Sequence, residues 1–257
     1  MDFKGKRVLI TAAGRGIARR GDERYAAAGA QVFASDIDAN RLADLKARHP
    51  AVHTHRADVS NEDEVDALFA AAHDALGGLD ILLAAAGIGG EVAPVETMST
   101  EGWRRCVGIN LDGAFFCARR AIPMIKAAGE GSIVLFSSMS GLYPYLHRSP
   151  YCAAKFGIIG LAKVLAMELG PDGINVNAIC PGAVEGERMA EVMAAEGRAR
   201  GIDPATLRQS YTQYSSMRTF ISADDVINMV MFVTSEAGRH VSGQALAVDG
   251  HTESFAG

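Results

Sequence analysis

Short apolar runs alternate with longer stretches of helical periodicity along most of the chain. The first pair is an apolar run at 7–11 followed by a helical pattern at 16–28. This alternation is typical of βαβ units, in which helices connect the strands of a parallel sheet and cover both of its faces. We therefore predict a doubly wound α/β fold with about seven parallel strands. The predicted strands are 7–11, 31–35, 52–56, 81–85, 132–136, 175–179 and 245–248, and the predicted helices are 16–28, 39–48, 62–76, 101–127, 151–169 and 223–235.

The stretch at 185–220 breaks this rhythm, because it is rich in Arg, Glu, Ala and Met at helical spacing but contains no predicted strand. We expect a helical insertion there, lying over the edge of the sheet. The helix at 223–235 has Ser222 as its expected N-cap, with Asp224 and Asp225 in its first turn, where the helix dipole favours anions. No repeat, linker or low-complexity tract interrupts the chain, so we expect a single domain spanning 1–257.

Composition and charge argue against several classes of function. The chain has 257 residues, of which 49% are hydrophobic, and this is enough for one large core. A net charge of -5, with both signs dispersed, leaves no basic stripe for nucleic acid. No apolar run approaches the length of a membrane span. The four cysteines have neither the spacing of a disulfide framework nor that of a zinc site, so we expect no metal and a reduced, cytoplasmic setting.

The first predicted strand leads through a glycine-bearing turn into a helix, an arrangement that binds dinucleotides. Small residues in such a turn let backbone N–H groups approach a pyrophosphate at the helix N-terminus. The turn contains Gly14, Arg15, Gly16 and Ile17, which are our candidate cofactor contacts. A tight connection between strand and helix also uses glycine when no ligand is present, so the turn alone is weak evidence.

Asp36 strengthens the prediction of a nucleotide site. It lies at the end of the second predicted strand, 20 residues after Gly16, where a carboxylate can hold the adenosine ribose hydroxyls. The alternative role of Asp36 is a solvated strand end that caps the next helix. Because a carboxylate repels a 2′-phosphate, Asp36 favours NAD over NADP. Arg15 favours NADP if its guanidinium faces that phosphate. If the guanidinium faces solvent, Arg15 favours neither NAD nor NADP.

Four further residues make the pattern specific. They are Asn110, Ser138, Tyr151 and Lys155, with Ser138 placed 13 residues before Tyr151 and Lys155 four residues after it. Together with the glycine turn, this arrangement resembles the short-chain dehydrogenase/reductase family in its form of roughly 250 residues. The resemblance covers essentially the whole chain, and it implies a Rossmann-type fold and a nicotinamide-dependent oxidoreductase. Taken singly, each of the four is more often an ordinary helix or turn residue.

Spacing and resemblance together suggest a proton path. Tyr151 and Lys155 are four residues apart on a predicted helix, so they share one face and the ammonium can lie near the phenol. A nearby cation lowers the pKa of a tyrosine from its ordinary value of about 10. The resemblance implies that Tyr151 exchanges a proton with the substrate hydroxyl and that Ser138 positions the substrate oxygen. It also implies that Tyr151 and Lys155 contact the cofactor, with Lys155 binding the nicotinamide ribose. It further implies that Asn110 holds a water that continues the path.

The resemblance also assigns cofactor contacts at other strand ends. It implies that Asp58 and Val59 meet the adenine, and that Gly87 forms the turn after the fourth strand. Pro181 and Gly182 match the family's loop beside the nicotinamide. Val184 is expected to reach the carboxamide through its backbone.

The chain departs from the family pattern at several positions. It has alanine at 12 and 18, where the family usually has glycine, and alanine at 84 and 85, where asparagine is common. Gly186 replaces a threonine that contacts the cofactor in the family. The stretch at 19–24 reads Arg-Arg-Gly-Asp-Glu-Arg, with glycine and aspartate where a packed helix needs apolar residues. Either the first helix is rearranged there or the sequence itself contains an error, and both possibilities bear on the nucleotide site.

In this family the segment before the catalytic tyrosine, here Tyr151, and the helical insertion contact the substrate and determine its specificity. Arginine suits a carboxylate, phosphate or sulfonate, so His147 or Arg148, together with Arg188, are candidates for contact with a polar or anionic substrate group. The alternative is that His147 and Arg148 are loop residues in water. A polyol, a sugar or a hydroxy acid fits such a pocket better than a long acyl chain or a steroid.

We therefore predict hydride transfer between NAD(H) and a small polar secondary alcohol or the corresponding carbonyl, with Tyr151 as acid and base. The preference for NAD suggests oxidation as the working direction. Two alternatives are a 3-oxoacyl-type carbonyl reductase and a non-catalytic member of the family that binds nucleotide. The resemblance also implies a homo-oligomer, a tetramer or a dimer, formed through the predicted helices at 101–127 and 151–169.

Overall fold

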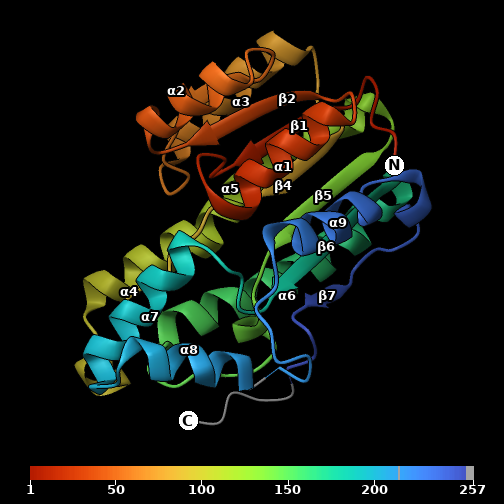
Figure 1. Cartoon of the computed structure of the whole chain (residues 1–257). Coiled ribbons are helices and arrows are strands. Elements are labelled where there is room, and N and C mark those ends of the chain that lie inside the picture. Colours follow the sequence, from red (N-terminus) through yellow and green to blue (C-terminus); the bar gives the residue numbers. More distant parts are fainter. Residues whose placement is uncertain (214, 253–257) are drawn as a thin grey trace.

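The computed structural model describes residues 1–213 and 215–252. Its centre is a parallel sheet of seven strands in the order β3-β2-β1-β4-β5-β6-β7 (Figure 1). The order reverses between β1 and β4, as in a doubly wound Rossmann-type sheet, and the predicted fold class is confirmed. The strands are β1 (Arg7–Thr11), β2 (Gln31–Asp36), β3 (His53–Arg56), β4 (Ile81–Ala84), β5 (Gly131–Phe136), β6 (Ile174–Pro181) and β7 (Ala245–Val248).

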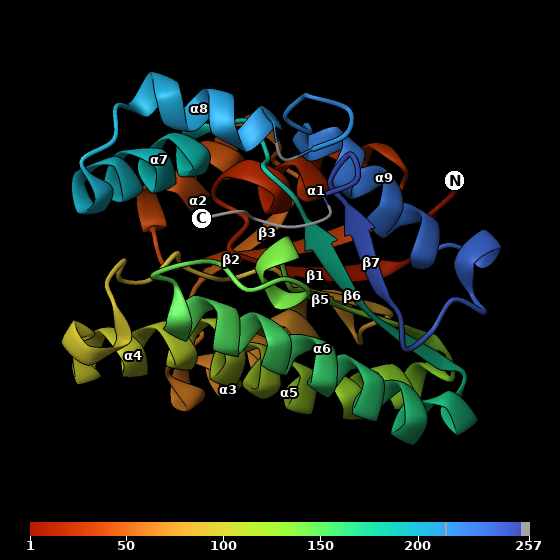
Figure 2. The same ribbon diagram turned by 90° about the horizontal axis from the view of Figure 1, so that it is seen from below.

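Helices cover both faces of this sheet, and Figure 2 shows the two layers edge-on. The first layer contains α1 (Gly16–Ala27), α2 (Ala39–Arg48) and α9 (Ala223–Val233), and the second contains α3 (Glu62–Leu76), α5 (Gly113–Ala128) and α6 (Ser149–Leu169). The remaining helices are α4 (Thr100–Val107), α7 (Glu187–Arg200) and α8 (Pro204–Gln213). Because α7 and α8 lie within 185–220, the predicted helical insertion is present.

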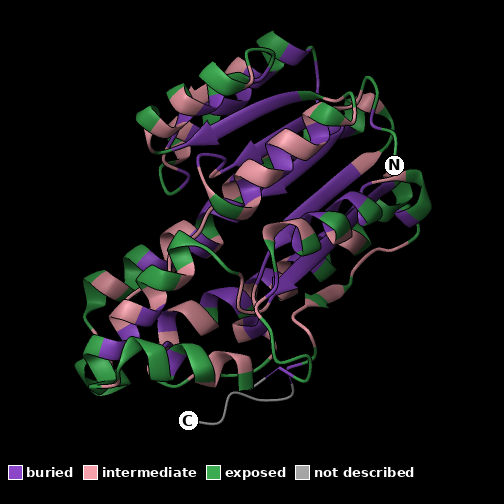
Figure 3. Ribbon diagram, in the orientation of Figure 1, coloured by how far each residue is buried: buried purple, intermediate pink, exposed green. Residues whose placement is uncertain are grey.

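The five inner strands β2, β1, β4, β5 and β6 are buried almost throughout, whereas the edge strands β3 and β7 are partly exposed (Figure 3). Successive residues of β1 point to opposite sides, so Leu9 enters the core beneath α3, α5 and α6, while Val8 and Ile10 enter the core beneath α1 and α9. Burial on both faces explains why the inner strands are continuous apolar runs in the sequence, and the partly exposed β3 has the polar sequence His-Thr-His-Arg. Within the described part of the chain, none of the helices has both the length and the hydrophobicity needed to cross a membrane.

The predicted long helix at 101–127 is present, but it is not α-helical throughout, because a π-helical turn lies within it. The chain forms α4, then a π-helical turn at Gly108–Asp112, and then α5. Asn110 lies in this turn and is buried; its Nδ2 donates to the carbonyl of Cys106 at 2.8 Å and to that of Ile88 at 3.0 Å. The side-chain amide thus competes for a carbonyl that an α-helical backbone would use, which accounts for the wider turn.

The unusual stretch at 19–24 forms a regular part of α1, so the helix is not rearranged. A Cβ on Gly21 would lie 3.3 Å from Cδ1 of Ile227 and 3.5 Å from Cδ1 of Ile10, so glycine allows α1 to approach both α9 and β1. Asp224, in the first turn of α9, accepts hydrogen bonds from Arg20 at 2.9 Å and from Arg24 at 2.6 Å. These ion pairs join α1 to α9 and give two of the arginines a structural role.

Asp22 is the residue of this stretch that is poorly satisfied. Its side chain is fully buried, and neither carboxylate oxygen has a hydrogen-bond partner among the described residues. Burial raises the pKa of Asp22 well above its ordinary value, with a smaller contribution from Glu23. Between about pH 4 and this raised pKa, the Asp22 carboxyl keeps its proton in the folded state but has lost it in the unfolded state. The free energy of unfolding therefore falls as the pH rises through this range.

We therefore expect Asp22→Asn to be more stable than the wild type at pH 8, with a gain of about 2 °C or more in Tm. The gain should shrink at pH 4.5, where the carboxyl group stays protonated in the folded protein. Thermal unfolding at the two pH values measures the difference, and Asp74→Asn on the exposed side of α3 is the control. An equal shift at both pH values would contradict the ionisation argument.

Candidate active site

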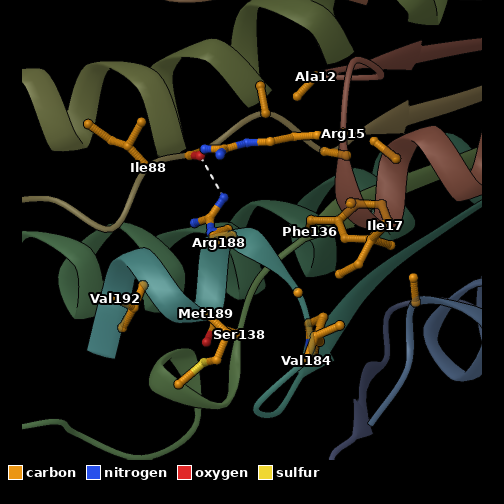
Figure 4. A pocket seen from close by; sticks show the side chains of 18 of the residues that line it. Ala12, Arg15, Ile17, Ile88, Phe136, Ser138, Val184, Arg188, Met189 and Val192 are labelled. Atoms are coloured by element: carbon orange, nitrogen blue, oxygen red, sulfur yellow. Dashed lines mark hydrogen bonds between the residues drawn. The ribbon is translucent and has the colours of Figure 1, made fainter. Parts of the chain in front are cut away.

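One cleft runs along the carboxyl ends of the strands, at the point where the strand order reverses. Its volume is about 820 Å³, within the usual range for a small-molecule site. It is lined by the glycine turn after β1, the loops after β2 to β6, and the beginning of α7. Figure 4 shows Arg15 and Ile17 on one wall and Met189 and Val192 of α7 on another.

The glycine turn has the geometry of a nucleotide cradle. The amide of Gly14 donates to Oδ2 of Asp36 at 2.9 Å, and a Cβ on Gly14 would lie only 2.8 Å from that oxygen. Gly16 adopts a left-handed conformation with φ of 61°, which glycine tolerates and which starts α1. Ala12 is also left-handed, with φ of 57°. The family's glycine would be unstrained there, so this departure has a conformational cost of about 1 to 2 kcal/mol.

The side chain of Arg15 is held by a partner from the helical insertion. Its guanidinium forms an ion pair with Glu191 of α7, with nitrogen–oxygen distances of 2.6 Å and 3.2 Å. This contact connects the glycine turn to the helical insertion across the mouth of the cleft. In this conformation the charge of Arg15 is compensated by a carboxylate of the same chain.

The fit of these residues to a dinucleotide can be judged from the cleft lining. All of the predicted cofactor contacts line the same cleft: Gly14, Arg15, Gly16, Ile17, Asp36, Asp58, Val59, Gly87, Tyr151, Lys155, Pro181, Gly182 and Val184. The cleft is therefore continuous from the predicted adenosine end at Asp36 to Tyr151. Close approaches require glycine along this path, since a Cβ on Gly182 would lie 2.8 Å from Cβ of Asp249. The arrangement fits an extended nicotinamide dinucleotide.

The alanines that replace asparagine after β4 are compensated from the neighbouring strand. Oγ1 of Thr11, the last residue of β1, accepts hydrogen bonds from the amides of Ala85 at 3.0 Å and Ala86 at 3.2 Å. The loop after β4 is thus attached to β1 through a hydroxyl group. This tie keeps Gly87 at the floor of the cleft without the side-chain amides that the family commonly uses.

The predicted catalytic residues meet where β5 and α6 approach each other. Ser138 follows the end of β5, and Tyr151 and Lys155 lie on one face of α6, which begins two residues before Tyr151. Nζ of Lys155 lies 5.6 Å from the centre of the Tyr151 ring and donates to the carbonyl of Phe136 at 2.7 Å. Ser137 adds a second tie, because its hydroxyl donates to the carbonyl of Lys155 at 2.8 Å.

Electrostatics favour the phenolate form of Tyr151. Burial by itself would raise the pKa of this tyrosine, but the ammonium of Lys155 and the guanidinium of Arg188 outweigh it. A hydrogen bond with Ser138 and the charge of Arg148 act in the same direction, so the pKa lies below its ordinary value. Burial lowers the pKa of Lys155, and the neighbouring Tyr151 opposes that shift. The pair is thus arranged for proton exchange near the substrate.

Asn110 reaches the same point from the π-helical turn. Its Oδ1 is buried without a hydrogen-bond partner among the described residues. A Cβ on Gly87 would lie 2.5 Å from this oxygen and 3.4 Å from Nζ of Lys155, so both polar groups face Gly87. An unpaired buried acceptor is typically satisfied by an ordered water, which agrees with the expected role of Asn110 in holding one.

Sequence reasoning missed several residues that shape this site. Thr11 and Ser137 act as ties, and Gly141 is needed because a Cβ there would lie 2.3 Å from Oγ of Ser137. Glu191 pairs with Arg15 over a separation of 176 residues. Family order indicates the catalytic positions, but no local pattern signals contacts between segments so far apart in the chain.

The insertion carries a second buried cluster beside the cleft. Glu196 of α7 is buried and accepts hydrogen bonds from the hydroxyls of Tyr145 at 3.1 Å and Tyr211 at 2.7 Å, and from Arg200 at 2.8 Å. Tyr145 and Tyr211 line the cleft, and their rings are stacked. This cluster attaches α7 and α8 to the segment before Tyr151.

Two of the three predicted substrate residues line the cleft. Arg148 is buried at the start of α6, and Arg188 projects from α7 and donates to the carbonyl of Gly87 at 2.7 Å, the dashed line in Figure 4. The alternative that Arg148 is a loop residue in water is therefore wrong. His147 is only partly buried, has a left-handed backbone, and is not among the residues that line the cleft.

Comparisons with known proteins agree with this geometry. The profile of a family described as enoyl-(acyl carrier protein) reductase matches residues 11–251. The chain is 32% identical to galactitol 2-dehydrogenase of Agrobacterium fabrum, over 97% of this chain and 98% of that protein. It is 33% identical to D-beta-hydroxybutyrate dehydrogenase of Cupriavidus necator, over 96% of this chain and 98% of that protein. The structure of levodione reductase matches with a TM-score of 0.92 and 30% identity, over 96% of this chain and 97% of that one. The chain belongs to the short-chain dehydrogenase/reductase family of hydride-transferring oxidoreductases.

Proposed function

We propose that this protein oxidises a small polar secondary alcohol with NAD, using Tyr151 as the general base. The observation that carries the proposal is the position of the Tyr151 phenol, beside Lys155 and Ser138, in a cleft that continues to Asp36. The relatives support the substrate class, since galactitol is a polyol and hydroxybutyrate is a hydroxy acid. A non-catalytic role is disfavoured, because all four catalytic positions are kept and assembled.

The chemistry divides between the chain and the cofactor. The phenolate of Tyr151 takes the hydroxyl proton of the alcohol while the hydroxyl of Ser138 holds the substrate oxygen. Bound nicotinamide supplies the hydride acceptor for the hydrogen on the carbinol carbon, and the alcohol becomes a carbonyl. Lys155 stabilises the phenolate through its positive charge. Asn110 holds a water at its unpaired Oδ1, and this water continues the path for the proton away from the site.

NAD is the proposed cofactor because of the charges at the adenosine end. Asp36 is nearly buried and is held by the amides of Gly14 and Asp38, both at 2.9 Å. A carboxylate fixed in this way can accept hydrogen bonds from ribose hydroxyls and repels a 2′-phosphate. The pairing of Arg15 with Glu191 supports the same choice, because the cation that would favour NADP is already neutralised.

We expect Asp36→Ser to change the ratio of kcat/KM for NAD over NADP by about 100-fold or more in favour of NADP. Removal of the carboxylate weakens the ribose contact and also removes the repulsion of the phosphate. Steady-state rates with both cofactors measure this ratio. Asp38→Ser is the matched control, since Asp38 carries a carboxylate two residues away that does not line the cleft. An unchanged ratio, or a wild type that prefers NADP, would overturn the proposed cofactor.

A homo-oligomer in the cytoplasm is proposed as the working form. Exposed apolar side chains lie on α5 and α6, the helices through which the resemblance implies pairing: Phe115, Phe156, Val164 and Met167. These side chains would be covered in a dimer or tetramer formed through that face. All four cysteines lie in the described part of the chain and are unpaired, which supports a reducing compartment.

A further inference from the structure

Arg148 lines the cleft as a buried arginine without an ion-pair partner among the described residues. Its exposed fraction is 6%, its Nε has no hydrogen-bond partner, and the guanidinium forms no ion pair with any described residue. Burying a cation is costly unless an anion or hydrogen bonds compensate it. Most arginines of this chain are paired with carboxylates, so a buried arginine that has no such partner among residues 1–213 and 215–252 is suited to binding the anion of a ligand.

The position of Arg148 sets where such an anion would lie. Its guanidinium carbon is 5.2 Å from the centre of the Tyr151 ring. A Cβ on Gly89 would lie 3.2 Å from Nη2 of Arg148, while Arg188 is bonded to the carbonyl of Gly87, two residues earlier. The two guanidinium groups therefore meet the same short loop, from α6 and from α7, beside the tyrosine that receives the proton.

Within the described residues, no carboxylate forms an ion pair with Arg148 or Arg188. Glu196, the buried carboxylate of α7, is bonded to Arg200, Tyr145 and Tyr211. Glu191 lies within the field of Arg188, but its two oxygens are bonded to Arg15. Among the described residues, the end of the cleft at Tyr151 therefore carries two positive charges in addition to Lys155.

We propose that Arg148, assisted by Arg188, binds the carboxylate of the substrate, so that the protein acts on short secondary hydroxy acids. This inference rests on the proposed function and narrows its substrate class from polar alcohols to anionic ones. A guanidinium can hold a carboxylate through two parallel hydrogen bonds, which fixes the orientation of the substrate as well as adding affinity. The carboxylate at Arg148 then directs the hydroxyl group, a few carbons away, to Tyr151.

The test compares pairs of substrates that differ only in charge. Each of several 2-, 3- and 4-hydroxy acids is assayed with NAD beside its own carboxamide, which has the same shape but no charge. We expect kcat/KM for the best acid to exceed that of its amide by about 100-fold. In Arg148→Gln this ratio should fall to within a few-fold of one, mostly through a higher KM for the acid, while the KM for NAD stays unchanged.

Two controls separate binding from other roles of Arg148. Arg148→Lys should restore part of the preference for the acid, because it keeps the charge without the two-pronged geometry. Arg198→Gln removes an exposed positive charge from α7 outside the cleft and should leave the ratio as in the wild type. Inhibition by a carboxylate that lacks the hydroxyl, such as butyrate against butyramide, gives a reading of binding that does not depend on turnover.

The outcomes distinguish the inference from the function on which it rests. Oxidation of neutral alcohols or polyols with no preference for any acid would overturn the carboxylate subsite and leave the dehydrogenase function intact. An equal decrease of kcat/KM for the acid and the amide in Arg148→Gln would also overturn the carboxylate subsite. It would mean that Arg148 acts on the reaction only through Tyr151. Absence of turnover with every compound and both cofactors would overturn the function and the inference together.

Discussion

Replacement of Tyr151 by phenylalanine is expected to lower kcat for alcohol oxidation by about 10³-fold or more. General acid–base catalysis contributes about 10² to 10⁴ in rate, and here the phenolate is the group that takes the proton in the cleft. The substitution removes one oxygen and keeps the ring over which the Arg148 and Lys155 cations lie. The KM for NAD should therefore change little. NADH formation at 340 nm, at saturating cofactor and substrate, measures the effect.

Ser138→Ala serves as the companion variant for Tyr151→Phe. The hydroxyl of Ser138 positions the substrate oxygen but does not receive the proton. We therefore expect its removal to lower kcat by only about 10- to 100-fold. A loss in Ser138→Ala larger than that in Tyr151→Phe would reverse the roles assigned to the two residues. Turnover that survives in Tyr151→Phe would remove the tyrosine from the reaction.

Replacement of Lys155 by methionine is expected to lower kcat/KM at pH 7 by about 10² to 10³. Loss of the ammonium raises the pKa of Tyr151, since Lys155 is the largest of the influences that lower it. Because oxidation requires the phenolate, the rise in rate with pH should move to higher pH, and each unit of the shift is worth a factor of ten at pH 7. Part of the lost activity should return at pH 10.

The pH–rate profile distinguishes this electrostatic role from a structural one. Lys155→Arg keeps a cation and should keep most of the wild-type profile, whereas methionine displaces it. The buried carbonyl of Phe136 loses its donor in the methionine variant, so circular dichroism and thermal unfolding are needed beside the kinetics. A profile whose midpoint is unchanged in Lys155→Met would contradict the proposed control of Tyr151 by Lys155.

The sequence was most informative where function and local structure coincide. Strands that are buried on both faces are apolar runs in the sequence, so the alternation of strands and helices along the chain, and with it the parallel sheet, could be predicted. The placement of the predicted catalytic residues agrees with the structure, in which Tyr151 and Lys155 share a helix face and Ser138 follows a strand, while their roles in catalysis stay a prediction. The organisation of residues 1–257 as one domain stays a prediction.

What the sequence could not predict depends on contacts between distant segments. The π-helical turn at Asn110 places the side-chain amide between the carbonyl of Cys106 and that of Ile88 in a neighbouring loop, and no periodicity in the sequence encodes the second contact. A glycine at position 21 of a helix has no local reason in the sequence, because it depends on the close approach of Ile227 from α9. The pairing of Arg15 with Glu191 likewise changes the interpretation of a residue whose role was ambiguous from the glycine turn alone.

Tyr151 is expected to ionise more easily than an ordinary tyrosine, and its titration can be measured directly. Absorbance near 295 nm reports phenolate formation, and the difference between the titrations of the wild type and Tyr151→Phe isolates this residue. Burial raises the pKa of Tyr25, and likewise raises that of Tyr145 to about 12, so neither interferes at lower pH. The predicted result is a single ionisation with a midpoint below about 10. A midpoint at or above 10, or no difference between the two proteins, would mean that Lys155 and the neighbouring arginines do not lower the pKa of Tyr151.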